Sequence, residues 1–449
     1  MSAGNDMLQA SRDALKDTSA YKRIARLFDD GSFTEIDSYA KSGDGFAEAA
    51  AGYGTIEGCP AYVFAQNSDI CGGAMSKAQA SKIKKVYELA VKTGAPVIGI
   101  YDSIGGRLDE GAEMMAAYGE ILCHSNNLSG VVPQIALVLG PCIGTSAMIA
   151  ANADLVVMSE KGELTLETSG NGASQEEAVK AGVCHVAAAT EDEAIDAVRN
   201  LVAVLPSNNL SGAPVVDGAG ESAVTLDCAA SGADMIAAVA DSGSFIELQK
   251  GFGEAVTAGL AQVAGATTGV VAYQGVIDGD ACSKAARFIR FCDAFAIPVV
   301  NFVDAEKFAS VREASKLSNA YSEATCPKVT VIAGSACGAV YIAMAGRGAN
   351  ADVTLAWPCA TVSPLAPATG AMFAWNDKLA GSENPVEDRK KLIEEYKNTE
   401  CTPFKAAAGG FIEDIIQPSE TRAKVIANLD MLASKRVSRL PKKHANIQL

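Results

Sequence analysis

The sequence contains few side chains suited to acid–base or nucleophilic catalysis. It has three histidines and two tryptophans, and aromatic residues make up only 6% of the chain. It also has no C-x-x-C pair, no G-x-S-x-G motif and no Gly-Lys dipeptide. These absences argue against a metal knuckle, a Ser-His triad and a P-loop. No G-x-G-x-x-G follows an expected strand, so a Rossmann dinucleotide site is unsupported as well.

Basic residues are also scarce. Lys and Arg number 37 against 53 Asp and Glu, which gives a formal charge of -16. This balance argues against a general affinity for nucleic acid or for an anionic membrane surface. It still allows an anionic small molecule to bind at one helix N-terminus.

What is abundant is small and apolar. The 449 residues are 49% hydrophobic and include 42 glycines, which is typical of a globular α/β protein of two or three domains. The first 17 residues are polar and show no secretory signal, so we expect a cytoplasmic protein. We also expect its twelve scattered cysteines to be reduced thiols, most of them buried.

One charge-free stretch, residues 121–152, is long enough to suggest a membrane span. It contains Pro133 and Pro141, however, and divides into an apolar strand at 135–140 and a small-residue helix that starts at Pro141. We therefore expect a buried strand–turn–helix unit and no membrane insertion.

An internal repeat organises the chain. Gly31-Ser32-Phe33 recurs as Gly243-Ser244-Phe245, and further short matches follow in the same order with a slowly falling offset. These matches pair Gly52 and Gly58 with Gly259 and Gly265, 76–78 with 283–285, 95–97 with 297–299, Asp102 with Asp304, and Gly140 and Gly144 with Gly334 and Gly338.

Helical and strand patterns support the repeat. Apolar residues at 83, 86, 87 and 90 follow helical spacing, and so do their counterparts at 285, 288, 289 and 292. Strands and helices alternate in both copies, which predicts mainly parallel sheets. We assign residues 1–205 to an N-terminal half, 206–220 to a linker and 221–449 to a C-terminal half.

Two strand-to-helix turns carry the candidate chemistry. The segments LGPCIGTSAM (139–148) and AGSACGAVYIAM (333–344) each end a strand and open a helix, whose first N–H groups have no intrahelical partner. Such a turn suits an oxyanion site; it is also compatible with ordinary tight packing. The segment DSIGGRLDEG (102–111) suits close approach to a ligand, although Arg107 is equally compatible with a structural ion pair.

Several longer motifs resemble one family. The segments GAPVIGIYDSIGGRLDEG, GVVPQIALVLGPCIG, EATCPKVTVIAGSACGAVY and FIEDIIQPSETRAKVIANLDMLASKRV lie across nearly the whole chain. They are similar to the carboxyltransferase (β) subunit of biotin-dependent acyl-CoA carboxylases and decarboxylases, of the propionyl-CoA carboxylase β and methylmalonyl-CoA decarboxylase α type.

The resemblance implies two tandem crotonase-like (ClpP/crotonase superfamily) ββα-repeat halves, usually in a homo-hexamer. It implies a carboxyl group moving between biotin on a separate carrier protein and the α-carbon of a short-chain acyl-CoA, through a thioester enolate and without a metal. The implied partners are the biotin carrier protein and either a biotin carboxylase or a membrane decarboxylase subunit. Two alternatives remain: a subunit of a sodium-pumping decarboxylase, and a non-catalytic scaffold subunit.

The resemblance also implies roles for individual residues. Backbone N–H groups of Gly144 and Thr145 would face the thioester oxygen, those of Gly338, Ala339 and Val340 the biotin ureido oxygen, and Gly105, Gly106 and Arg107 would line the acyl-CoA pocket.

The chain departs from the family pattern at Thr145 and Ala339, where glycine is usual, and in shortened segments at 159–175 and 303–316. We expect φ to stay negative at Thr145 and Ala339. We also expect the 303–316 loop to leave a wide pocket that binds free biotin weakly. The Gly338 turn should face the Gly140–Thr145 turn of a neighbouring subunit.

Overall fold

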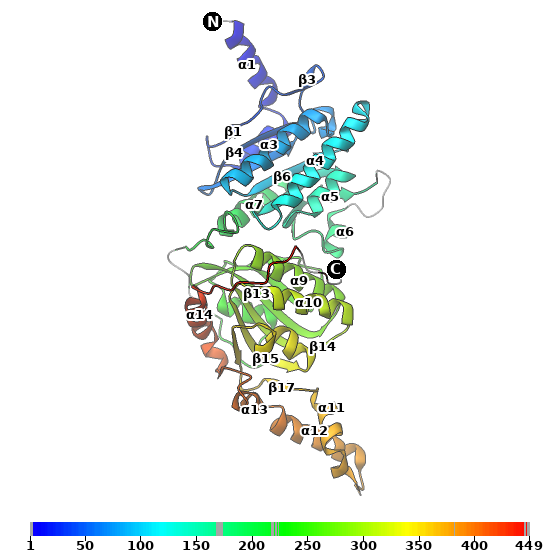
Figure 1. The fold of residues 1–449 in the computed structure, drawn as a ribbon, viewed down its shortest axis with the longest axis vertical. Helices are drawn as coiled ribbons and strands as arrows, with labels where there is room; N and C mark the ends of the chain where they lie inside the picture. The colour runs from blue at the N-terminus through cyan, green and yellow to red at the C-terminus, as the bar shows by residue number, and fades with distance from the viewer. Residues whose placement is uncertain are drawn as a thin grey trace. The chain divides into compact units, whose positions relative to one another are not determined.

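The computed structural model describes residues 3–167, 174–216, 220, 222, 224–380, 382–443 and 446. The chain forms two compact units, Met1–Pro214 with Gln249–Gly251 and Val215–Leu248 with Phe252–Leu449 (Figure 1). The division falls inside the stretch predicted to be a linker.

The first unit is built on a mostly parallel sheet of eight strands. Their order is β1-β4-β5-β6-β7-β8-β10, with β9 paired to β7; β1, β4 and β5 are antiparallel, and the strands from β5 onward run parallel. The strands are β1 (Thr34–Glu35), β4 (Ala49–Ile56), β5 (Cys59–Gln66), β6 (Val97–Ser103), β7 (Gln134–Ile143), β8 (Leu155–Ser159), β9 (Glu163–Thr165) and β10 (Val186–Ala188). The helices are α1 (Ala3–Leu15), α2 (Ser19–Leu27), α3 (Lys77–Thr93), α4 (Ala112–Leu128), α5 (Thr145–Ala151), α6 (Gln175–Lys180) and α7 (Glu191–Val204), and β2 (Lys41–Ser42) and β3 (Gly45–Phe46) form a small hairpin.

The second unit has the same sheet topology, with order β11-β12-β13-β14-β15-β16-β18 and β17 paired to β15. This identity confirms the internal repeat. The strands are β11 (Ile246–Leu248), β12 (Val256–Val263), β13 (Ala266–Ile277), β14 (Val299–Phe308), β15 (Lys328–Cys337), β16 (Val353–Ala356), β17 (Thr361–Ser363) and β18 (Asp414–Ile415). The helices are α8 (Gly232–Val239), α9 (Gly279–Ala294), α10 (Val311–Glu323), α11 (Pro367–Trp375), α12 (Pro385–Glu400), α13 (Pro403–Ala408) and α14 (Thr421–Leu432).

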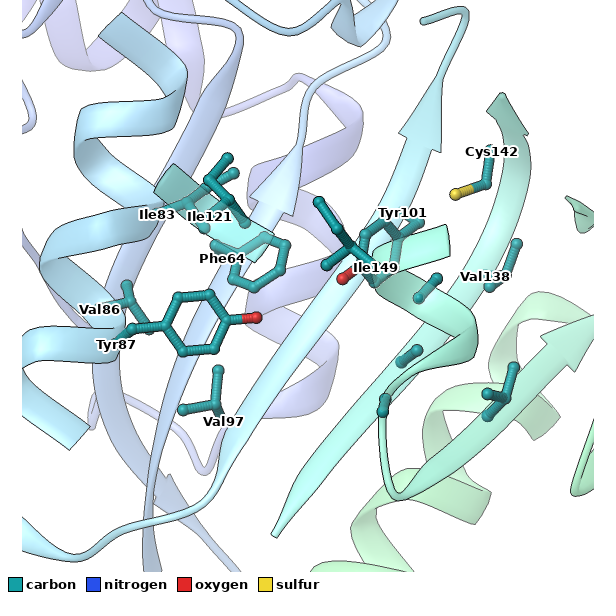
Figure 2. Packing of buried hydrophobic residues seen from close by; sticks show 14 of the residues in the cluster. Phe64, Ile83, Val86, Tyr87, Val97, Tyr101, Ile121, Val138, Cys142 and Ile149 are labelled. Carbon is teal, nitrogen blue, oxygen red and sulfur yellow. The ribbon is translucent and has the colours of Figure 1, made fainter. Parts of the chain in front are cut away.

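Helix α3 contributes the face that the sequence pattern predicts. Ile83, Val86 and Tyr87 are buried against Phe64 and Tyr101 of the sheet, and the rings of Phe64 and Tyr101 meet edge to face at 5.6 Å (Figure 2). The counterpart apolar positions on α9 are buried as well. The predicted helix face is therefore confirmed in both units.

Strand β6 shows that both faces of its sheet are covered. Val97 and Tyr101 belong to the α3 cluster, whereas Ile98 and Ile100 are equally buried outside that cluster. Because alternate side chains of a strand point to opposite faces, helices must cover both sides of this sheet.

One match in the predicted repeat is wrong. Ser76 caps α3 by accepting the N–H of Gln79, and Asp278 caps α9 by accepting the N–H of Ala281. These equivalent caps are 202 residues apart, so the match of 76–78 with 283–285 is out of register. Five more residues separate Tyr62 from the α3 cap Ser76 than separate Gly269 from the α9 cap Asp278, because the repeat offset falls there from 207 to 202.

The helix predicted to start at Pro141 begins later. Strand β7 continues through Pro141, which pairs with Glu163 of β9, and α5 starts at Thr145. Proline is tolerated because the β6–β7 register shifts at this point and its missing N–H is not needed by the ladder.

The 303–316 segment is not a loop either. Strand β14 extends to Phe308 by pairing with the long β13, and α10 begins at Val311, so only two residues connect them. Of the other shortened segment, 159–175, residues 168–173 lie outside the described part of the chain.

The basic C-terminal segment is partly paired with other residues of the second unit. The side chain of Lys435 is only 10% exposed; its Nζ pairs with Asp352 at 2.7 Å and donates to the carbonyl of Cys326 at 2.9 Å. The guanidinium of Arg439 donates to the carbonyl of Ser322 at 2.5 Å. These cations satisfy carbonyls at and just beyond the C-terminal end of α10. By contrast, α12 is a charged helix of which only Leu392 is buried.

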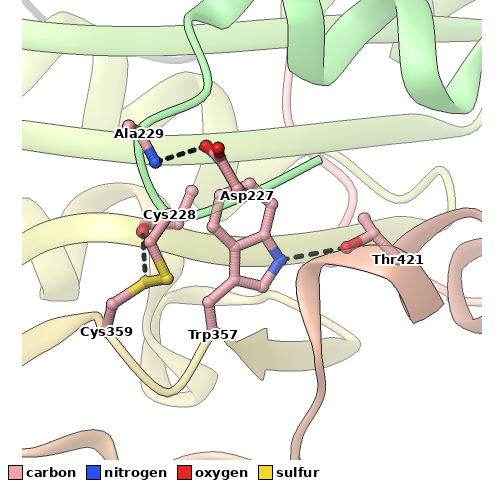
Figure 3. The surroundings of a disulfide bond; sticks show 7 residues. Asp227, Cys228, Ala229, Trp357, Cys359 and Thr421 are labelled. Atoms are coloured by element: carbon pink, nitrogen blue, oxygen red, sulfur yellow. Dashed lines mark hydrogen bonds between the residues drawn. A yellow bond between two sulfur atoms is a disulfide. The ribbon is translucent and has the colours of Figure 1, made fainter. Parts of the chain in front are cut away.

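The expectation that the cysteines are reduced is wrong for one pair. Cys228 and Cys359, 131 residues apart and both exposed, form a disulfide (Figure 3). Their proximity comes from packing of the segment before α8 against the loop after β16, which no local sequence pattern predicts. Trp357 anchors that loop: its ring is fully buried and its Nε1–H donates to Thr421 at 2.9 Å. Of the ten free cysteines, seven are buried.

In the described part of the chain, no helix is both long and apolar enough to cross a membrane. The charge-free stretch at 121–152 is divided between α4, β7 and α5, as a strand–turn–helix arrangement requires.

Candidate active site

In the first unit, the predicted site residues gather at one edge of the sheet. Strands β6 and β7 run parallel and Ser103 is in register with Cys142, so the Gly105–Arg107 loop and the Gly144 turn both follow the same strand ends. Parallel strands deliver their following loops to a common edge, which is where α/β proteins build their sites. The structure therefore brings together the residues predicted for acyl-CoA binding.

The conformation of the turn after β7 explains why this chain has glycine at 144 but not at 145. Gly144 has φ +70° and ψ −133°, a conformation that residues with a side chain rarely adopt. Thr145 is not among the residues with positive φ, as expected, so threonine is tolerated there. The N–H of Gly144 donates to the carbonyl of Thr165 at 2.8 Å. The first-turn N–H groups of α5 without an intrahelical acceptor are those of Thr145 and Ser146.

The second unit repeats this turn. Gly338 has φ +54°, Ala339 keeps a negative φ, and the N–H of Gly338 donates to the carbonyl of Ser363 at 2.9 Å. The N–H groups of Ala339 and Val340 then open the following helical segment, with the Val340 side chain buried.

That segment differs from the simple helix predicted from the sequence. It is short, and Tyr341–Ala345 forms a π-helix, an irregularity found frequently at functional sites.

The carbonyls that hold the two turns come from β9 and β17, two three-residue strands paired to the ends of β7 and β15. The sequence analysis missed them. Three residues are too few for a periodic pattern, so only the glycines of the turns gave a signal.

The Gly105–Gly106 loop is clamped to the segment before α3. The N–H of Met75 donates to the carbonyl of Gly105 and the N–H of Arg107 donates to the carbonyl of Met75, both at 2.8 Å. A Cβ at Gly106 would lie 1.9 Å from the sulfur of Met114, so a larger residue there would require this flexible side chain to move.

Arg107 forms the structural ion pair that the sequence left open. Its guanidinium lies 2.7 Å from Glu48, which is completely buried, and 2.6 Å from Asp109. Hydrogen bonds to Asp109 and Glu48 raise the pKa of Arg107. Because leaving Glu48 buried without a cation would be costly, this pairing helps to fix the loop. A role for Arg107 in substrate binding stays a prediction.

Side chains near the first turn are poor acids or bases at neutral pH. Burial raises the pKa of Cys142 and of Tyr118, whose hydroxyl accepts a hydrogen bond from Ser146 at 3.3 Å. His185 is buried between β8 and β10, where its Nδ1 accepts the N–H of Val156 at 3.1 Å. The first-turn N–H groups are therefore the candidate donors at this turn, and such groups suit an oxygen that gains negative charge during a reaction.

Two α/β units with the same sheet topology and the same glycine turn define a duplicated α/β fold. The chain matches the carboxyl transferase domain family over residues 16–447 and belongs to that family. It is thus a biotin-dependent carboxyltransferase, and the predicted family and enzyme class are confirmed.

Its relatives cover nearly its full length. The chain is 37% identical to the methylmalonyl-CoA decarboxylase subunit alpha of Veillonella parvula, over 96% of this chain and 93% of that protein. It is 36% identical to the propionyl-CoA carboxylase beta chain of Saccharopolyspora erythraea, over 100% of this chain and 93% of that protein.

A solved structure supports the fold. The hexameric transcarboxylase 12S, crystallised with methylmalonyl-CoA, aligns with a TM-score of 0.90 at 31% identity over 98% of this chain and 94% of its own. This likeness confirms the predicted α/β fold with two tandem crotonase-like halves.

Proposed function

We propose that the protein moves a carboxyl group between biotin on a separate carrier protein and the α-carbon of a short-chain acyl-CoA. The observation that carries this proposal is the duplicated turn, in which Gly144 and Gly338 adopt positive φ and the next residues present backbone N–H groups. Two such donor sets suit a reaction in which charge develops on two carbonyl-type oxygens.

On the acyl-CoA side, the N–H of Thr145 stabilises the thioester oxygen as the enolate forms. Gly144 shapes this turn, and Gly105 and Gly106 leave room for the thioester chain. Arg107 holds its loop in place through Glu48. These residues bind and orient the acyl group, and none of them acts as a side-chain base.

On the other side, the N–H groups of Ala339 and Val340 donate to the ureido oxygen of biotin, with Gly338 shaping the turn. Biotin supplies the group that carries the carboxyl between the two substrates. Two neighbouring N–H donors fit this oxygen because it is a carbonyl-type acceptor on which negative charge develops during the reaction.

We further propose that the working enzyme is a cytoplasmic homo-hexamer in which the Gly338 turn faces the Gly140–Thr145 turn of a neighbouring subunit. The transcarboxylase 12S relative is described as a hexamer. A biotin carrier protein and either a biotin carboxylase or a membrane decarboxylase subunit complete the system. The decarboxylating direction is the second candidate, favoured by the 37% identity to a methylmalonyl-CoA decarboxylase subunit.

Exchange of labelled carboxyl between methylmalonyl-CoA or malonyl-CoA and free biotin tests the function. The wild-type protein should catalyse it, with weak saturation by biotin. Absence of exchange with every short-chain acyl-CoA would favour the scaffold alternative. Adding a partner biotin carboxylase or a membrane subunit, each with the carrier, then distinguishes the two directions.

The donor assignment has its own test. Thr145 occupies the first position of α5, where proline is well tolerated. Thr145→Pro removes one N–H and should lower kcat about 100-fold or more, whereas Thr145→Ala keeps the N–H and should retain most activity. Ala339→Pro and Ala339→Ser form the matching pair on the biotin side. Equal activities within a pair would refute that donor.

A further inference from the structure

A carboxylate lies against bare backbone just before each turn. A Cβ built at Gly140 would lie 2.3 Å from Oδ1 of Asp102, and one at Gly334 would lie 2.0 Å from Oδ1 of Asp304. Both contacts fall where the register between the two central strands shifts in the same way, between Tyr101 and Ser103 and between Val303 and Ala305. The same arrangement, an aspartate against a glycine where the strand register shifts, therefore occurs in both units.

The first unit holds its aspartate with side chains. Oδ2 of Asp102 accepts the guanidinium of Arg23 at 2.6 Å and the hydroxyl of Ser68 at 2.8 Å. The residue after Gly140 is Pro141, which has no N–H to offer. Asp102 is therefore tied to α2 and to the segment after β5, and not to β7 itself.

The second unit lacks both of those partners. Met235 occupies the repeat position of Arg23, because the caps of α2 and α8 pair Phe28 with Ala240. At the repeat offset of 207 that holds for β5 and β13, Ser68 corresponds to Gly275, which has no side chain. Instead, the residue after Gly334 is Ser335, and its N–H donates to Oδ1 of Asp304 at 2.8 Å.

We propose, resting on the function proposed above, that Asp304 is a positioning residue for the biotin side. By accepting the Ser335 N–H, its carboxylate fixes the path of β15 three residues before Gly338. That path aims the N–H groups of Ala339 and Val340. No corresponding bond reaches β7, so the acyl-CoA turn is set by other contacts, and the two sides of the reaction are separable by mutation.

The strand itself supplies the test. Ser335→Pro removes the donor N–H and introduces the residue that the first unit has at this point, so the backbone path accommodates it. Ser335→Ala keeps the N–H and is the matched control. Asp304→Ala removes the acceptor, and Asp304→Asn keeps an oxygen that accepts the bond.

In the exchange assay with free biotin, Ser335→Pro and Asp304→Ala should raise the KM for biotin about 10-fold or more, since a charge-assisted hydrogen bond is lost. The KM for acyl-CoA should stay within about twofold, and Ser335→Ala and Asp304→Asn should resemble the wild type. A wild-type profile for Ser335→Pro, or equal changes in both KM values, would overturn the proposal.

Amide hydrogen exchange gives a readout that does not depend on activity. Ser335→Pro and Asp304→Ala should speed exchange at residues 336–342 and leave residues 143–149 unchanged. Absence of carboxyl exchange by the wild-type protein would refute the proposed function. Unchanged amide protection at residues 336–342 in Ser335→Pro and Asp304→Ala would refute the positioning role. If Ser335→Pro does not fold, Asp304→Ala against Asp304→Asn decides the same question.

Discussion

The two units have the same sheet topology, the same register shift and the same glycine turn, but they balance their buried charges differently. In the first unit, buried acids meet cations from distant elements: Arg23 with Asp102 at 2.6 Å and Lys82 with Glu35 at 3.1 Å. In the second unit, the repeat counterpart of Lys82 is Lys284, whose Nζ donates to the carbonyl of Phe252 at 3.1 Å.

One arrangement of charged groups, an aspartate that accepts two N–H groups and pairs with an arginine, occurs in both units. Asp29 accepts the N–H groups of Glu57 and Gly58 and pairs with an arginine on α7, and its counterpart Asp241 accepts those of Ala264 and Gly265 and pairs with an arginine on α14. This arrangement closes the β-hairpin of each sheet. The comparison shows that ion pairs that shape the backbone of the sheet persisted, while those between helices and the core diverged.

The largest expected effect on the free energy of unfolding comes from replacing Arg23 with methionine, the residue that the second unit has at the equivalent position, Met235. Arg23→Met leaves Asp102 without its buried cation and should lower the free energy of unfolding by about 3–5 kcal/mol. Arg26→Met, on the same helix but in an exposed pair with Asp196, should cost at most about 1 kcal/mol. Urea unfolding followed by circular dichroism measures both. Similar losses for the two variants would mean that the buried pair is not special.

The disulfide should stabilise only the second unit. Cys359→Ser should lower the free energy of unfolding by about 2–4 kcal/mol, because the bond restricts the unfolded chain. Both tryptophans, Trp357 and Trp375, belong to the second unit, so their fluorescence follows its unfolding alone. A reducing buffer should abolish the difference, and Cys123→Ser, which removes an exposed free thiol, should have no effect. A loss that persists under reducing conditions would point to packing instead.

The smallest expected effect is a pH dependence at Lys284. Burial lowers the pKa of Lys284 to about 8. The folded protein therefore releases this proton at a lower pH than the unfolded chain does, and the cost of the buried charge is present below pH 8 and disappears as the pH rises.

Lys284→Met should therefore stabilise the second unit at pH 7 by at most about 3 kcal/mol, with the gain vanishing near pH 10. Comparison with the wild type at each pH cancels the buried thiols, whose raised pKa values act in the opposite direction. Lys82→Met, which leaves Glu35 without its ion-pair partner, should instead destabilise the first unit at pH 7. A gain independent of pH would show that the pKa of Lys284 is the same in the folded and the unfolded chain, so that burial of its charge carries no cost.

The sequence was sufficient for the repeat and the sheets because apolar periodicity and glycine positions depend on local contacts. Gly144 and Gly338 were recognisable because a positive φ leaves few other choices. The pairing of Cys228 with Cys359 and the holding of both turns by β9 and β17 depend on segments far apart or very short. Tertiary packing decides such features, and no local pattern records them.

The contact between each aspartate and the glycine beside it also restricts how the family can change. At Gly334, even one added methyl group would overlap the carboxylate of Asp304, so an alanine is admissible only after the aspartate has been replaced by something smaller. Replacing the aspartate first gives up the acceptor of the Ser335 N–H. At this pair the aspartate must therefore change before the glycine. The same order applies to Gly140 and Asp102, where replacing the aspartate first gives up the ion pair with Arg23 instead.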